Sequence, residues 1–331
     1  MAIVLGIEST AHTFGVAVVR NGKILSNVKR SYVTDKGGII PMEAAKHHRE
    51  NKREIYFESL RQAGIKEKEI DAVAISQGPG LAPCLLEGMR FAKELAVNLR
   101  KPMVPVNHCV SHLEIGRITG AKDPVMLYVS GANTQVISYA SGKFRVFGET
   151  LDIGIGNFID TFARYVGIGF PGGPVIQKLA EQGKNFVELP YKVKGMDVAL
   201  SGILTNLRQK LESEKYSLND LAYSLQENVF AMLVEVSERA LAHTGKKELL
   251  LGGGVACNKR LQEMCRIMCR ERGARFFCPD NSLLVDNAAM IAFLGEIMFN
   301  NGDYVKLENI DKIDIAPRER TDDVEVSWRK N

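Results

Sequence analysis

The chain has 331 residues, of which 45% are hydrophobic and 25% charged, and its formal net charge is +4. This length exceeds what one ordinary core holds, so we expect two lobes. The sequence pI of about 8.6 lies below the values above roughly 9 that are typical of dedicated nucleic-acid modules, so a polyanionic partner is permitted but not required. No apolar run approaches the roughly 20 residues of a membrane span, and the N-terminus lacks a signal-peptide layout. We expect a cytoplasmic protein without membrane contact.

The first third of the chain is predicted to open with a three-stranded meander. The dipeptide Asn21-Gly22 is a strong hairpin signal between the second and third strands. The pattern predicts strands at 2–7, 14–19, 23–28, 71–76 and 103–107, with helices at 41–63 and 84–99.

A similar layout starts again at residue 124. It predicts strands at 125–129, 135–139, 144–147, 247–251 and 275–278, and helices at 157–167, 174–183, 203–213, 218–243, 258–272 and 286–301. The order of predicted strands and helices repeats, but the amino-acid sequence itself shows no clear repeat. It predicts an α/β fold of the duplicated actin-like, sugar-kinase and Hsp70 type, with two lobes and a central nucleotide cleft. We expect residues 1–121 with 297–326 to form the first lobe, 122–296 the second, and 327–331 a tail or the start of a linker.

Two polar turns occupy equivalent places in the repeat. The first contains Glu8, Thr10 and His12, and the second runs from Ser130 to Gln135. Both offer backbone N–H groups and hydroxyls, which suit a phosphate, although turn chemistry alone explains either one. A third glycine segment, Gly252–Gly254, lies between a strand and a helix and is neither GxGxxG nor GxxxxGK[ST].

A pair of histidines suggests a metal site. His108 and His112 are four residues apart on a predicted helix, which places both rings on one face. Cys109 stands where an HExxH protease has its glutamate, so the general base of that protease is absent. Asp286 begins a later helix and is most simply an N-cap; spacing alone does not bring it to the histidines. The six cysteines form no CxxC pair, which favours reduced thiols.

Short segments along nearly the whole chain, roughly residues 3–326, occur in the order of one known family. They are GIESTAHT, SQGPGL, VNHCVSHLEIG, LYVSGANTQV, GETLDIGIGN, FPGGP, LPYKVKGMD, LSG, SLQE and GGGVACNKRL. Several are weak alone, but the ordered set is specific. It resembles the universal tRNA adenosine-37 threonylcarbamoyltransferase family, formerly called O-sialoglycoprotein endopeptidase, in its archaeal and eukaryotic branch.

The resemblance implies a set of site residues. The metal ligands would be His108, His112, Tyr128 and Asp286, with one divalent metal, Fe²⁺ being favoured over Zn²⁺. The nucleotide and substrate contacts would be Glu8, Thr10, His12, Tyr128, Ser130, Gly131, Ala132, Asn133, Thr134, Gln135, Asp160, Gly173, Gln177, Gly253, Gly254 and Asn258. No general base is assigned.

The resemblance also implies a reaction and partners. The threonylcarbamoyl group would pass from threonylcarbamoyl-AMP, whose AMP moiety occupies the ATP-type site, to N6 of adenosine-37 in tRNAs that read codons beginning with adenine. The partners would be tRNA, a RIO-type kinase and the other subunits of the KEOPS assembly. The ending RTDDVEVSW resembles the point where some archaeal members are fused to that kinase.

Three departures from the family pattern concern the nucleotide site. Ala132 replaces the second glycine of SGGNTQ, Gln177 stands where relatives have glutamate, and Lys259 replaces the second asparagine of NNRL. We expect nucleotide affinity that is retained but altered. The alternative functions are a sugar-kinase-like phosphotransferase or a nucleotide-gated binding module on the same fold, and a metallopeptidase, against which the missing glutamate argues.

Overall fold

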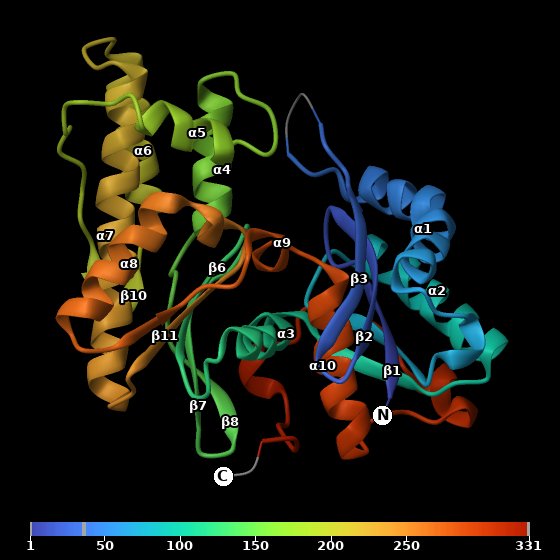
Figure 1. Cartoon of the computed structure of the whole chain (residues 1–331). Helices are drawn as coiled ribbons and strands as arrows, with labels where there is room; N and C mark the ends of the chain where they lie inside the picture. Colours follow the sequence, from blue (N-terminus) through green and yellow to red (C-terminus); the bar gives the residue numbers. More distant parts are fainter. Residues whose placement is uncertain (1, 35–37, 330–331) are drawn as a thin grey trace.

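The computed structural model describes residues 2–34 and 38–329 and shows two lobes side by side (Figure 1). The first lobe is built on a five-stranded sheet in the order β3-β2-β1-β4-β5. Its strands are β1 (Ile3–Glu8), β2 (Thr13–Arg20), β3 (Lys23–Ser31), β4 (Ala72–Gly78) and β5 (Met103–Asn107). The first three are antiparallel, and β4 and β5 add in parallel. Asn21 and Gly22 both have positive φ angles, of 54° and 67°, as the predicted hairpin turn requires.

The second lobe repeats this sheet. The strand order β8-β7-β6-β11-β12 again combines an antiparallel meander with two parallel strands. Its strands are β6 (Val125–Val129), β7 (Thr134–Ala140), β8 (Lys143–Glu149), β11 (Glu248–Gly252) and β12 (Arg275–Phe277). The duplication expected from the sequence pattern is therefore confirmed at the level of sheet topology.

Helices cover both faces of the first sheet. Alternation along β1 sends Ile3, Leu5 and Ile7 into one apolar cluster with residues of α1 (Pro41–Ala63) and α2 (Ala82–Leu99). The opposite face packs on α10 (Ala288–Asn301). The contact is close, because a Cβ at Gly6 of β1 would lie 2.4 Å from the backbone nitrogen of Ala292.

The second lobe has more helices, and its core gathers residues from most of them. They are α4 (Ile155–Tyr165), α5 (Gly173–Ala180), α6 (Ser201–Glu212), α7 (Leu218–Thr244) and α8 (Lys259–Glu271). Elements that the sequence analysis missed are the hairpin β9 (Val193–Lys194) and β10 (Asp197–Val198), the short helix α9 (Asn281–Leu284), and the 3-10 turns η1 (Glu67–Glu69), η2 (Gly116–Thr119), η3 (Gly254–Cys257), η4 (Leu307–Lys312) and η5 (Thr321–Asp323).

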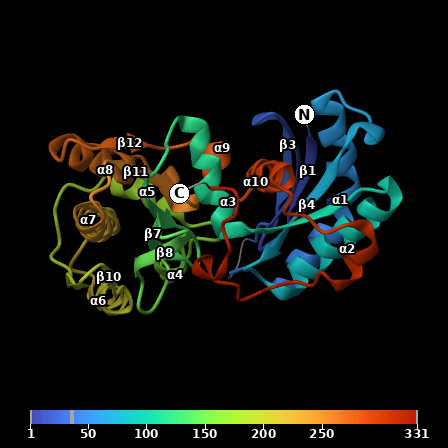
Figure 2. The ribbon, with the colours of Figure 1, turned by 90° about the horizontal axis from the view of Figure 1, so that it is seen from below.

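Two segments connect the lobes before the C-terminal segment. The short helix α3 (His108–Ile115) leads from the first sheet toward the second, and the chain returns through α9 to α10 (Figures 1 and 2). The boundary expected after residue 296 cuts α10, whose residues from Ala288 onward pack on β1 and β2. We therefore place α10 with the first lobe, because its apolar face is buried there.

The C-terminal segment also departs from the expected division. Residues 327–329 of the expected tail are ordered against α3, where Trp328 and Arg329 contact Glu114; residues 330 and 331 lie outside the described part. The turn η5 packs against β8 of the second lobe, although 297–326 was expected to belong to the first. Within the described residues, no helix is long and apolar enough to cross a membrane.

Candidate metal centre and nucleotide pocket

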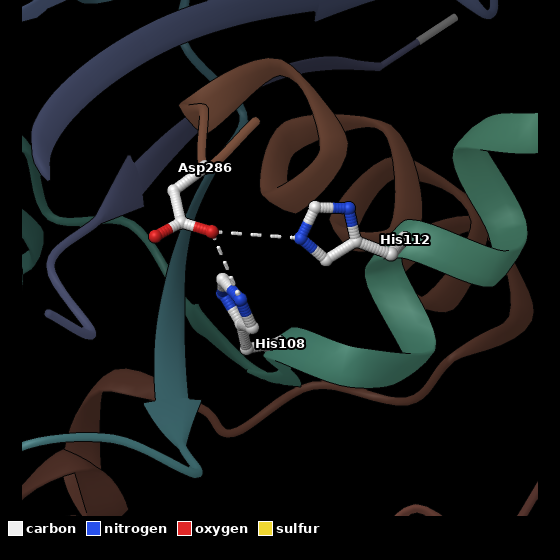
Figure 3. Close-up of side chains that lie close together, drawn as sticks. All are labelled: His108, His112 and Asp286. Carbon is white, nitrogen blue, oxygen red and sulfur yellow. Dashed lines mark ion pairs between the residues drawn. The ribbon is translucent and has the colours of Figure 1, made fainter. Parts of the chain in front are cut away.

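Two buried histidines of α3 and one half-buried aspartate from the return crossing form a cluster (Figure 3). The strand β5 runs directly into α3, and the Asn107 side chain caps the helix by accepting the Val110 N–H at 3.0 Å. Asp286 Oδ1 lies 3.4 Å from Nε2 of His108 and 3.7 Å from Nε2 of His112. One ligand atom from each residue lies within 4.8 Å of the others. The expected metal ligands His108, His112 and Asp286 are thus brought together.

Asp286 is free for this role because its neighbour caps the helix. The side chain of Asn287, and not that of Asp286, accepts the N–H of Met290 at 3.1 Å at the start of α10. The N-cap interpretation of Asp286 was therefore wrong by one residue. Displacing the cap by one position leaves the carboxylate of Asp286 facing the histidines.

The state of His112 fits a metal ligand. Its ring is buried, and neither ring nitrogen has a hydrogen-bond partner within the described structure. Burial lowers the pKa of His112, although Asp286 opposes the shift. A neutral imidazole can give its nitrogen lone pair to a divalent cation. Because a buried ring without hydrogen-bond partners is costly, its position next to a carboxylate favours a bound metal ion at this place. The His–His–Asp group can therefore bind a metal.

Glu8 was expected to contact the nucleotide or substrate, but in the structure it supports His108. Its side chain is fully buried; Oε1 accepts the N–H of Thr10 at 2.7 Å, and Oε2 lies 3.0 Å from Nδ1 of His108. The carboxylate accepts the Nδ1–H of His108, which leaves Nε2, on the side of Asp286, as the atom whose proton a metal would replace. Burial opposes protonation of His108, but the charges of Glu8 and Asp286 outweigh it and raise its pKa well above the ordinary value.

Tyr128 lies at the edge of the cluster. Its ring is buried with its centroid 5.2 Å from that of His112. Burial raises the pKa of Tyr128 well above its ordinary value, with further contributions from Cys109 and Asp286. The structure thus places the fourth expected ligand beside the histidines, with its hydroxyl bonded toward Ser130 and Cys109.

The second polar turn is enclosed by two glycine loops. The N–H groups of Gly156 and Asn157 donate to the carbonyls of Ser130 and Gly131 at 3.0 and 2.9 Å. A Cβ at Gly156 would lie 2.7 Å from Cα of Gly131, and one at Gly253, whose φ is +90°, would lie 2.3 Å from the carbonyl of Val129. The turn 130–135, the loop 154–157 and the glycine segment 252–254 therefore pack backbone against backbone, and we call these three segments the platform.

Some expected nucleotide contacts serve this platform instead of facing a ligand. The Thr134 hydroxyl accepts the N–H of Ile155 at 2.8 Å, and the Gln135 amide donates to Glu149 at 3.1 Å. Asn258 caps α8 through its side-chain oxygen and donates to Gln226 at 2.9 Å. Gly131, Ala132 and Gly254 are exposed.

A pocket of about 410 Å³ lies between this platform and the first lobe, lined by Gly38, Ile39, Ile153, Asn157, Asp160, Thr161, Arg164, Gly169 and Phe170. Asp160 accepts the N–H of Gly172 at 2.8 Å, and burial raises its pKa. Gly173 starts α5 with open space around its Cα. Gln177, further along α5, donates to Glu181 at 3.2 Å.

His12 links the pocket to the metal cluster. Its ring stands edge-on to Phe170, with 5.4 Å between centroids, and its Nδ1 lies 4.0 Å from Oδ2 of Asp286. Thr10, in contrast, is buried, with its hydroxyl bonded to Glu8 and 3.3 Å from Nδ1 of His108. Of the first turn, His12 contacts a ring that lines the pocket, and Glu8 and Thr10 support α3 at His108.

Lys29 is a site residue that sequence reasoning missed. It pairs with Gly15 in the β2–β3 register, and its ammonium donates to the backbone carbonyl of Asp286 at 3.0 Å. Burial lowers the pKa of Lys29, and the charges of Asp286, Cys257 and Glu8 oppose the shift. No local signal in β3 announces this contact, because it depends on how α10 lies on the sheet.

One protein family and several known proteins match most of this chain. The family described as tRNA N6-adenosine threonylcarbamoyltransferase (TsaD) matches residues 23–293. The protein of that name from Thermococcus sibiricus is 52% identical over 98% of this chain and its own full length. A probable member from Drosophila melanogaster is 46% identical over 99% of both chains.

Longer relatives exist as well. A probable bifunctional tRNA threonylcarbamoyladenosine biosynthesis protein from Methanosarcina mazei is 49% identical over 99% of this chain, which covers 60% of that protein. Among solved structures, HypF of T. kodakarensis superposes with a TM-score of 0.63 at 16% identity, over 92% of this chain and 48% of HypF. That likeness concerns the fold, and it agrees with the predicted actin-like class. The sequence matches go further: this chain belongs to the tRNA N6-adenosine threonylcarbamoyltransferase family.

Proposed function

We propose that this enzyme transfers a threonylcarbamoyl group from threonylcarbamoyl-AMP to N6 of adenosine-37 in tRNA at the His108–His112–Asp286 centre. The observation that carries the proposal is the position of this centre, which His12 connects to a pocket beside a phosphate-type turn. An acyl donor whose AMP moiety occupies the pocket would have its reacting carbonyl directed toward the cluster.

The residues of the cluster would hold one divalent cation, with Tyr128 as the fourth ligand. Two imidazoles, a carboxylate and a phenol form a set of nitrogen and oxygen donors that suits Fe²⁺, with Zn²⁺ as the alternative. When bound, such a cation supplies Lewis acidity and a template for carbonyl or phosphate oxygens. Glu8 holds the Nδ1–H of His108, so that Nε2 is the nitrogen that would bind the cation, and Lys29 fixes the backbone of Asp286.

The nucleotide would lie on the platform of the second lobe. Asp160 suits a ribose hydroxyl as acceptor, and Asn157 with Arg164 offers donors from the pocket wall. The exposed backbone at Gly131 and Ala132 suits the phosphate, and the methyl group of Ala132 points to altered rather than lost affinity. Gly173, Asn133 and Gly254 complete the proposed contacts.

The partners follow from the same proposal. tRNA is the acceptor substrate, and a RIO-type kinase, separate or fused, with the other KEOPS subunits would complete the cytoplasmic assembly. Relatives named bifunctional are longer than this chain, which supports a fused arrangement in part of the family. We expect the isolated chain to turn over slowly, and full turnover without partners would contradict that expectation.

The test is mass spectrometry of nucleosides from tRNA incubated with the enzyme, its partners and threonylcarbamoyl-AMP. The double variant His108→Ala/His112→Ala is compared with His243→Ala, which changes an exposed histidine of α7 beside Phe147. We expect threonylcarbamoyladenosine with wild type and His243→Ala and none with the double variant. If wild type binds metal and nucleotide but leaves tRNA unmodified, the transferase proposal fails, and a phosphotransferase or nucleotide-gated module on this fold takes its place.

A further inference from the structure

The C-terminal segment, residues 314–329, follows the metal-binding helix from end to end. Figure 2 shows it crossing from the side of α2 toward α3 and ending between the lobes. At its start, the Gln77 side chain donates to the carbonyl of Asp314 at 2.7 Å, and the N–H of Gly80 donates to the carbonyl of Pro317 at 3.2 Å. The segment is thereby fixed to the end of β4 before it reaches α3.

The segment holds the first turn of α3 through its N-cap. Asn107 caps the helix with its side-chain oxygen, and its side-chain nitrogen donates to Oε2 of Glu319 at 2.7 Å. Glu319 therefore fixes the amide orientation that the cap needs, one residue before the metal ligand His108. The buried Thr321 then reaches the thiol of Cys109, the residue that follows His108.

The segment holds the last turn of α3 through a buried carboxylate. Glu114 is fully buried two residues after His112, and its Oε1 accepts from the indole nitrogen of Trp328 at 3.0 Å and from Nε of Arg329 at 2.7 Å. A carboxylate at this depth requires partners, because an unpaired buried charge is costly. Its Oε2 also pairs with Arg117 of η2 at 3.3 Å, so Trp328 and Arg329 are the partners that tie it to the C-terminal segment. The cation of Arg329 also lies over the rings of Tyr139 and Phe144, 5.3 and 5.1 Å from their centroids.

We infer that residues 314–329 are a positioning element of the metal centre, and that Glu114, Trp328 and Arg329 are positioning residues. The inference rests on the proposed metal site. The segment holds α3 at both ends and reaches the second sheet through Tyr139 and Phe144, so it fixes the helix that carries His108 and His112 relative to both lobes. Loss of the anchor at Glu114 frees the last turn of α3 and with it the ring of His112.

The test compares Trp328→Phe and Arg329→Met with Arg275→Met. Trp328→Phe removes one N–H and keeps an aromatic ring, so it preserves the fold. Arg275 is a matched control, because it also pairs with a buried glutamate, Glu248, and lies over a ring, that of Phe277, but at β12 and away from α3. Arg329→Lys keeps the charge, so we expect it to lose less Zn²⁺ affinity than Arg329→Met.

Two readouts decide the inference. Competition between each purified full-length variant and a chelator gives the Zn²⁺ dissociation constant, which we expect to rise about tenfold in Arg329→Met, in the range of outer-shell changes, and to stay unchanged in Arg275→Met. Amide hydrogen exchange of residues 108–115 is expected to speed up in both Trp328→Phe and Arg329→Met. Unchanged exchange of α3 in these two variants overturns the inference. If wild type binds neither Zn²⁺ nor Fe²⁺, the proposed metal centre fails, and exchange of α3 alone still decides the role of the segment.

Discussion

The change Glu8→Gln tests how the protein prepares His108 for a metal. In the native structure the Glu8 carboxylate lies 3.0 Å from Nδ1 of His108 and accepts the hydrogen bond of the Nδ1–H, so a metal can replace the proton on Nε2, which lies 3.4 Å from Asp286. A glutamine still accepts the bonds from Thr10 through its oxygen, but then presents an NH₂ group to Nδ1. The histidine must place its proton on Nε2 to accept that donor, and Nε2 is the atom that a metal needs.

The magnitude follows from the position of Glu8 behind a ligand. Residues that orient metal ligands change metal affinity by about 10- to 100-fold when substituted, or roughly 1.4 to 2.7 kcal/mol at about 1.4 kcal/mol per tenfold change. We expect the upper half of this range, because the substitution both removes a buried charge and reverses the tautomer. The fold itself should survive, since glutamine has nearly the same shape.

The assay is Zn²⁺ binding by purified enzyme in competition with a chromophoric chelator, together with thermal unfolding without metal. Glu87→Gln is the matched control, because Glu87 is also a buried glutamate of the first lobe but pairs with Arg49, at 2.7 Å, and not with the cluster. Wild-type Zn²⁺ affinity in a folded Glu8→Gln enzyme would refute the argument. An equal loss of Zn²⁺ affinity in Glu87→Gln would show that the loss does not depend on the contact between Glu8 and His108.

Three further results are expected. His48 is buried, and its pKa is lowered to about 4, mainly by burial. Because this histidine binds its proton near pH 6.5 in the unfolded chain, the free energy of unfolding is highest above that pH and falls by up to about 3 kcal/mol toward pH 4. Chemical unfolding at pH 7 and 4.5 should show a smaller fall in stability for His48→Gln than for wild type. Gly156→Ala places a methyl group 2.7 Å from Gly131, whereas Gly202→Ala, at an exposed position of α6, meets nothing within 4 Å. Calorimetry should therefore show weakened AMP binding in the first variant alone, and equal affinities would contradict the packing argument. Zn²⁺ at one hundred times its dissociation constant should stabilise wild type by about 2.7 kcal/mol and leave the melting temperature of Asp286→Ala unchanged, a difference that disappears if Asp286 is no ligand.

The sequence predicts the metal centre well where the chemistry is local. The spacing of His108 and His112 implies one helix face, and the structure confirms both the helix and the cluster. Asp286 is far away in sequence, and capping rules gave it a structural role that belongs to Asn287. Only the family resemblance named it as a ligand, because a contact between α3 and the start of α10 depends on packing between elements.

The supporting contacts could not be predicted for the same reason. Glu8 meets a histidine 100 residues away, and Glu114 meets Trp328 and Arg329 more than 200 residues away. In the sequence, Glu8 reads as part of a phosphate turn and Glu114 as an ordinary helical glutamate. Their burial distinguishes them, and burial follows from the arrangement of α3 between the lobes.

The two polar turns are equivalent in the duplicated pattern, yet the structure gives them different surroundings. The first uses Glu8 and Thr10 to hold His108, while Gly156 and Gly253 close around the second. This division makes a paired prediction: Glu8→Gln should weaken Zn²⁺ binding with little change in AMP affinity, and Gly156→Ala should do the reverse. Because His12 contacts both regions, with Phe170 on one side and Asp286 on the other, His12→Ala should affect both. Equal losses of both ligands in all three variants would mean that the turns act as one site, as their sequence equivalence suggests.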